Sequence, residues 1–171
     1  KGGSIIDMSL SVAGVYEIIG NSGVDILTGG LGNDILTGDG SSSLAGSFKY
    51  LAVETIEREN TFNSKAGIDP VTDLTTGDIL IVSPGATVNA TNISNFIATS
   101  STSNSGTVNL TAGNSGSTIT MMNSSLGAYT ITGGNGVDNL TGGSENDIID
   151  GVDGNDNLTG GAGNDRFNIT V

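Results

Sequence analysis

The chain of 171 residues contains no cysteine, histidine or tryptophan, and only two prolines. The lack of cysteine excludes disulfides, zinc–thiolate sites and thiol nucleophiles. The lack of histidine excludes a serine–histidine catalytic triad and histidine metal sites. Basic residues are scarce as well, because five of them stand against 18 acidic residues, for a formal net charge of −13. This charge argues against direct binding to nucleic acid or to anionic membrane surfaces. No apolar run of about 18 residues is present that would indicate a transmembrane segment.

Glycine, in contrast, is abundant, with 28 residues, and aspartate makes up 13 of the 18 acidic residues. A high glycine content without a period is typical of disorder, so the spacing of the glycines decides the interpretation. The glycines follow a nine-residue period, and we call each nine-residue repeat a line. A line has Gly at its first place, usually Gly at the fourth, an acid at the sixth and an apolar residue at the eighth. Six lines fit this pattern, and they begin at Gly20, Gly29, Gly133, Gly142, Gly151 and Gly160.

Each line predicts a tight turn followed by a three-residue strand. Glycine permits the turn because it adopts positive φ at little steric cost, and the polar–apolar–polar ending has the alternation of a strand. Two lines then form a coil of 18 residues, and stacked coils form two parallel sheets with the eighth-place side chains between them. The sixth-place acids are Asp25, Asp34, Asp138, Asp147, Asp156 and Asp165, and the eighth-place residues are Leu27, Leu36, Leu140, Ile149, Leu158 and Phe167.

These lines resemble GGxGxDxUx (U, apolar), the nonapeptide repeat of the RTX proteins. The resemblance implies an all-β fold, a parallel β-roll (β-solenoid) with calcium as the cofactor in its turns. In that family an ion lies between turns on the same edge, held by the sixth-place Asp of both lines and by turn carbonyls. Lines two apart share an edge, so the resemblance predicts one calcium site at Asp138 and Asp156 and a second at Asp147 and Asp165.

The first run of lines is expected to bind calcium with fewer carboxylates. An 18-residue spacing pairs Asp25 with a line that begins at Gly38 and offers Ser42 instead of an acid, although Asp39 is near. Asp34 pairs with lines that lack an acid. In the second run, Glu145 replaces the fourth-place glycine, which makes the carbonyl geometry of that turn less certain.

A second, longer period links the two ends of the chain. Shifted by 113 residues, the segment around Tyr16 matches the segment around Tyr129, with both tyrosines at sixth places. The nine-residue phase therefore predicts metal-free coils near 2–19 and 115–132. The echo also predicts that the chain is a segment of a longer tandem-repeat protein.

Three segments follow from this pattern: a first β-roll segment at 1–46, a β-rich spacer at 47–114 and a second β-roll segment at 115–171. The spacer has no nine-residue period, and we expect it to contain a short helix. Apolar spacing favours a helix within 48–58, although a strand also fits its start, and a short capped helix fits 92–97. Turns are predicted at Asp69-Pro70 and at 83–85, and strands are predicted at 78–82, 107–110 and 118–121.

Two functions remain open at this point. The first is a secreted, calcium-stabilised structural repeat protein of a surface layer, adhesin stalk or extracellular filament, in which copies of the chain associate. The second is the calcium-folding secretion or accessory module of an RTX toxin or secreted hydrolase. Paired carboxylates are present, but no nucleophile–base set accompanies them, so we do not expect an enzyme. Both functions place the chain outside the cell or at the cell surface, and the simplest alternative is that the acids only keep the chain soluble.

Overall fold

The described part of the chain is built from strands and contains no helix. The computed structural model describes residues 5–8, 10, 16–19, 26–28, 35–38, 47–49, 61–64, 67–71, 74–76 and 78–169. Its strands are β1 (Ile5–Asp7), β2 (Glu17–Ile19), β3 (Ile26–Thr28), β4 (Ile35–Gly38), β5 (Ser47–Lys49), β6 (Thr61–Ser64), β7 (Gly67–Val71), β8 (Ile79–Val82), β9 (Ala86–Ile93), β10 (Asn95–Ile97), β11 (Ser103–Asn104), β12 (Thr107–Ala112), β13 (Thr118–Thr120), β14 (Thr130–Thr132), β15 (Asn139–Thr141), β16 (Ile148–Asp150), β17 (Asn157–Thr159) and β18 (Arg166–Asn168). These residues accordingly include no helix long and apolar enough to cross a membrane.

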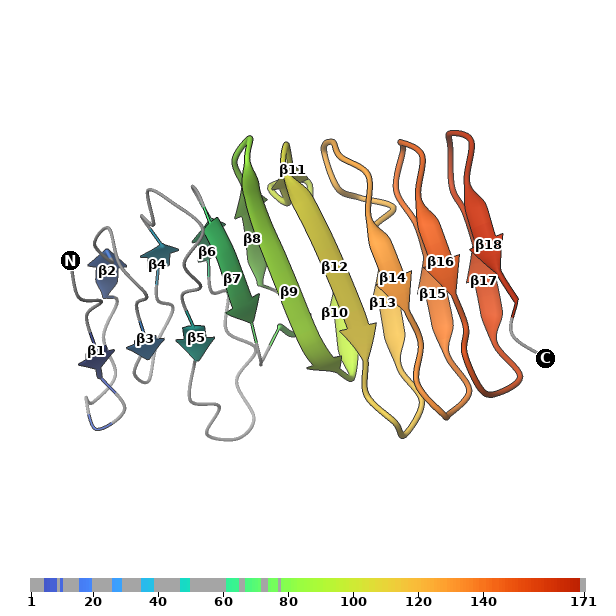
Figure 1. The fold of residues 1–171 in the computed structure, drawn as a ribbon, viewed down its shortest axis with the longest axis horizontal. Coiled ribbons are helices and arrows are strands. Elements are labelled where there is room, and N and C mark those ends of the chain that lie inside the picture. Colours follow the sequence, from blue (N-terminus) through green and yellow to red (C-terminus); the bar gives the residue numbers. More distant parts are fainter. Residues whose placement is uncertain are drawn as a thin grey trace.

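The strands form a parallel β-solenoid that runs from the N-terminal to the C-terminal end of the molecule (Figure 1). One wall is a single nine-stranded sheet with the order β1-β3-β5-β7-β9-β12-β14-β16-β18. The opposite wall consists of a five-stranded sheet, β11-β8-β6-β4-β2, followed along the chain by a four-stranded sheet, β10-β13-β15-β17. This arrangement confirms the prediction of a parallel β-roll.

The register of the strands shows how regular the coils are. At the C-terminal end each coil spans 18 residues, because Thr130 pairs with Ile148 and Ile148 pairs with Arg166. Other coils are longer: Ile26 pairs with Ser47, 21 residues further along the chain. The 18-residue spacing that would match Asp25 with Ser42 therefore does not hold at β3 and β5.

The nine-stranded sheet also passes through the segment that has no nine-residue period. β5 pairs with β3 on one side, and β12 pairs with β14 on the other. The wall is thus continuous across positions 46 and 114. The division of the chain into 1–46, 47–114 and 115–171 stays a prediction about sequence segments.

One apolar side chain per strand fills the space between the walls. Leu27, Val71, Ala90, Leu110, Ile131 and Ile149 from the nine-stranded sheet face Ile18, Phe62, Leu80, Phe96, Ile119 and Leu140 from the other two sheets, and all twelve are buried. Each coil contributes so few of these side chains that it needs its neighbours to bury them.

The expected short helix at 92–97 is wrong, because these residues belong to β9 and β10. Ile93 and Phe96 are both buried, and their three-residue spacing imitates one face of a helix. Instead, the chain turns a corner there, with Asn92 at a φ of 59°, so that the two side chains enter the core from different walls. The expected helix within 48–58 cannot begin at Phe48, which lies in β5, and residues 50–60 lie outside the described residues.

The expected turn at Asp69-Pro70 is also wrong, because both residues lie in β7. Proline has no backbone N–H and cannot donate to a neighbouring strand, which is why it often marks a turn or an edge. Here β7 pairs with β5 only at Phe48 and Val71, while five residue pairs join it to β9. The predicted turn at 83–85 and the predicted strands at 79–82, 107–110 and 118–120 are confirmed.

Candidate metal sites

The second run of lines places its four sixth-place aspartates at the ends of turns, each directly before a strand. We call the edge with turns 133–138 and 151–156 edge A, and the edge with turns 142–147 and 160–165 edge B. Asp138 and Asp156 end the turns of edge A, and Asp147 and Asp165 end those of edge B. The 18-residue coils thus bring together the pairs that the sequence predicted.

Hydrogen bonds join the members of each pair. The backbone N–H of Asp138 donates to Oδ1 of Asp156 at 3.0 Å. The backbone N–H of Asp147 donates to Oδ1 of Asp165, also at 3.0 Å. Each lower carboxylate therefore reaches the backbone of the coil above it, where the upper carboxylate is attached.

The two upper carboxylates are buried and receive two backbone N–H groups each. Asp138 is 0% exposed and accepts from Ser117 N at 2.6 Å and from Gly134 N at 2.7 Å. Asp147 is 1% exposed and accepts from Tyr129 N at 2.7 Å and from Gly143 N at 2.6 Å. A buried carboxylate needs such partners, because an unsatisfied charge in the interior is costly. A carboxylate oxygen with one such bond still has a free lone pair, which a cation can use.

Electrostatics on edge B disfavour the charged form of Asp147. Burial raises the pKa of this carboxyl group, and the N–H groups of Gly143 and Tyr129 oppose that effect. The negative charges of Asp165 and Glu145 raise the pKa of Asp147 further. A cation beside Asp147 would act in the opposite direction and favour the ionised carboxylate.

First-place glycines leave the room that these carboxylates occupy. A Cβ atom on Gly133 would lie 2.7 Å from Oδ2 of Asp138 in the same line, well inside van der Waals contact. The first-place glycines of the other three lines, Gly142, Gly151 and Gly160, face a carboxylate oxygen of their own line in the same way. Glycine at the first place is therefore required because any side chain would compete with the sixth-place acid for space.

Glu145 does not displace the turn that it enters. Its carbonyl oxygen lies against Gly163 in the next coil, where a Cβ atom would come within 2.5 Å of it. On edge A, the carbonyl of Gly136 lies against Gly154 in the same manner. Glutamate at this fourth place thus keeps the carbonyl in the position that glycine gives it, with its own side chain exposed.

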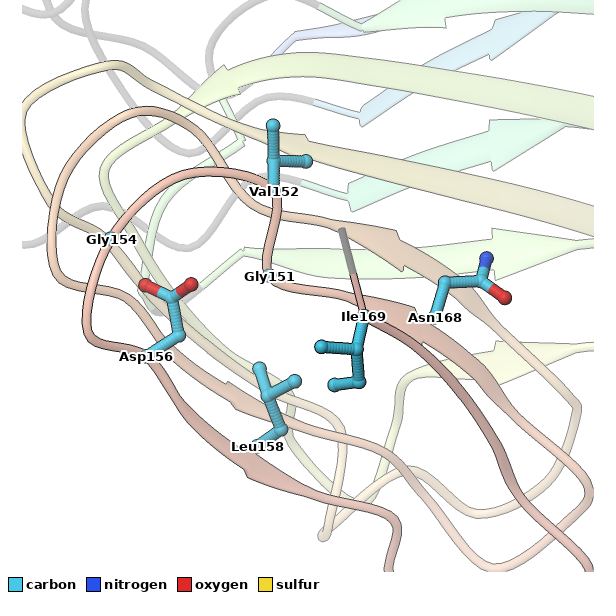
Figure 2. Close-up of a pocket in the computed structure, with 7 residues that line it drawn as sticks. All are labelled: Gly151, Val152, Gly154, Asp156, Leu158, Asn168 and Ile169. Carbon is cyan, nitrogen blue, oxygen red and sulfur yellow. The ribbon is translucent and has the colours of Figure 1, made fainter. Parts of the chain in front are cut away.

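The donor atoms of these turns fit calcium and not a softer metal. Each edge offers two carboxylates and several backbone carbonyls, and calcium prefers six to eight oxygen ligands. The described residues contain no group of three or more acidic side chains, so most ligands at each site would have to be carbonyl oxygens or water. Figure 2 shows the turn 151–156, with the carboxylate of Asp156 pointing into the loop of its own turn. We expect Asp138 and Asp156 to hold one ion and Asp147 and Asp165 to hold another, and this assignment stays a prediction.

Two other predicted ligands, Asp25 and Asp34, lie outside the described residues. Sequence reasoning also missed one acid, Asp78, which is 0% exposed and accepts hydrogen bonds from the backbone N–H and the hydroxyl of Thr75. Asp78 lies two residues before Leu80, the same offset that separates a sixth-place acid from its eighth-place residue. This offset was the available signal, but the missing glycines of that segment concealed it.

The comparison with known families supports the repeat directly. Residues 17–42 and 132–167 match the RTX calcium-binding nonapeptide repeat, in four copies. No curated protein and no solved structure is similar enough to the chain to count as a match. The chain therefore carries RTX calcium-binding repeats in both of its β-roll segments, a type of repeat that is typical of secreted proteins.

Proposed function

We propose that the chain is a secreted, calcium-stabilised structural protein that forms part of a surface layer, an adhesin stalk or an extracellular filament. One observation carries this proposal: the buried, paired aspartates lie in turns whose only evident task is to hold successive coils together. We infer no catalytic activity for the chain, because no nucleophile–base set accompanies the carboxylates.

Calcium would act on this solenoid by joining one coil to the next. In its absence, Asp138 and Asp156 repel each other, as do Asp147 and Asp165, because stacked coils are only about 4.8 Å apart. A bound ion would supply two positive charges between two carboxylates of neighbouring coils. If free calcium is about ten times the dissociation constant, each site adds about 1.4 kcal/mol to the free energy of unfolding. Extracellular calcium modules typically have dissociation constants of about 10⁻⁴–10⁻³ M, so this stabilisation would be available mainly outside the cell.

Self-association of copies is part of this proposal. In the described residues, β17 and β18 each pair with a strand on one side only. Strands with one free edge are sites at which another strand can add, and contacts between unlike ends of a solenoid propagate as a filament. Calcium ions and further copies of the chain are therefore the partners that we propose.

Electron microscopy of native material, with calcium and with excess chelator, would test this function. We expect ordered assemblies in calcium that disappear after chelation. Single short particles under both conditions would contradict the structural role. Calcium-dependent folding without assembly would instead favour the second function, a secretion or accessory module of an RTX toxin or secreted hydrolase, whose full-length protein must contain a catalytic or toxin domain.

A further inference from the structure

Tyr129 occupies a sixth place in the coil directly before Asp147, where the neighbouring lines carry an acid. Its ring is buried, with 2% of the residue exposed. Val108, which precedes it in the same wall, is also buried, so Tyr129 marks the point at which the column along edge B changes from apolar residues to aspartate.

The hydroxyl group of Tyr129 is fixed by the loop that precedes it. It lies 2.5 Å from Oγ of Ser124 and donates to the carbonyl of Leu126 at 3.1 Å. This loop is in turn attached to the coil above, because Asn104 donates from its backbone to Leu126 O at 3.0 Å and from its side chain to Ala128 O at 2.6 Å. Tyr129 is therefore anchored to a hydrogen-bonded layer that contains no charged residue.

Tyr129 also contacts both groups that hold the Asp147 carboxylate. Its own backbone N–H donates to Oδ1 of Asp147 at 2.7 Å. Its ring lies beside Gly143, where a Cβ atom would be 3.5 Å from Cε2 of the ring, and the N–H of Gly143 donates to Oδ2 of Asp147 at 2.6 Å. A change in the position of Tyr129 would thus move both donors of this carboxylate.

We propose that Tyr129 is a positioning residue for the edge B calcium site: its anchored phenol orients Asp147 for an ion shared with Asp165. The inference rests on the proposed calcium-binding function. On edge A, the corresponding backbone N–H belongs to Ser117, and it donates to Asp138 at 2.6 Å. The Ser117 side chain reaches only Gly113 O, at 3.4 Å. Edge A therefore has no anchored ring, so the role of Tyr129 is restricted to one of the two sites.

The two edges supply an internal control for a test by calorimetric calcium titration of the full chain. Asp156→Asn leaves only the edge B pair intact, and Asp165→Asn leaves only the edge A pair. Tyr129→Phe is then added to each background, with Ser124→Ala as a milder second variant. Ions bound near Asp25 or Asp34 contribute equally to both backgrounds.

We expect Tyr129→Phe to weaken calcium binding roughly tenfold in the Asp156→Asn background, the lower end of the loss typical for removal of an outer-shell partner. In the Asp165→Asn background we expect less than a twofold change. Ser124→Ala should show a smaller loss with the same preference for edge B. Leu80→Val, which perturbs the buried core of the five-stranded sheet, should change neither affinity.

An equal loss in both backgrounds would show that the phenol acts only on global stability, and unchanged affinity in the Asp156→Asn background would show that it does not act at all. Either result overturns the inference and leaves calcium binding in place. If the parent chain binds no calcium, the proposed function is wrong and the inference is wrong with it.

Discussion

Val152 tests how the turns of the repeat are built. It lies at the second place of its line with a φ of 67°, in the left-handed region that a β-branched residue rarely adopts. Gly161 has the same place in the next line and a φ of 99°. The turn, and not the residue, therefore imposes this conformation, and replacing Val152 by Gly or by Ala measures its cost.

The two replacements are predicted to differ in an unusual direction. In an ordinary conformation glycine is less stable than alanine by about 0.5–1 kcal/mol, because glycine loses more conformational entropy on folding. In the left-handed region a Cβ atom costs about 1–2 kcal/mol. Val152→Gly should therefore be more stable than Val152→Ala by about 0.5–1 kcal/mol. Loss of the valine side chain cancels in this comparison, since both variants lack it.

Urea unfolding followed by circular dichroism at saturating calcium would measure this difference. Ala162 provides the matched control, because it lies at the third place of the next line, is exposed and has no positive φ. Ala162→Gly should lower the free energy of unfolding by about 0.5–1 kcal/mol, the normal direction. The reasoning is refuted if Val152→Ala is as stable as Val152→Gly, or more stable.

Three further predictions concern the core, the ions and pH. Leu140→Ala should lower the free energy of unfolding by about 2–5 kcal/mol, because Leu140 is 0% exposed, whereas Leu126→Ala, at 46% exposure, should change it by less than about 0.5 kcal/mol in the same urea assay. Excess chelator should remove hydrogen-exchange protection from β15 to β18 while β9 and β12 stay protected, and uniform loss across all of these strands would contradict a calcium-independent middle. In chelator the raised pKa of Asp147 means that, between its ordinary and its raised value, the folded chain holds a proton that the unfolded chain has lost. Stability should therefore fall as pH rises through this window, and Asp147→Asn should flatten the fall in urea melts between about pH 4 and 7.

Much of the second β-roll segment follows from its period alone. The nine-residue line predicts the strand, the inward side chain and the edge on which each acid lies, and the observed 18-residue register confirms these predictions. The reason is physical: a glycine at the first place and an aspartate at the sixth must share one small space, so the spacing records the geometry of the turn. A short repeat under such a constraint leaves little freedom for another fold.

The middle of the solenoid is harder to predict because no such constraint acts there. Val88 and Val108 are neighbours in the nine-stranded sheet, each two residues before the core residue that faces inward from its strand, and both are buried. Packing of apolar side chains accepts several residue types and several loop lengths, so it leaves no fixed period in the sequence. The same tolerance explains why Ile93 and Phe96 looked helical.

The order of residues along edge B gives the two kinds of coil different roles. From β9 to β18 the place two residues before the inward core residue is filled by Val88, Val108, Tyr129, Asp147 and Asp165 in turn. The valine coils need no ion, because their side chains pack in the interior. The aspartate coils bring like charges together and need a cation to stay stacked. Since a coil is stable only against a neighbour, a calcium-independent middle offers the first aspartate coil a formed surface on which to stack. Tyr129 lies at this junction, held by an uncharged layer on one side and bonded to a carboxylate on the other.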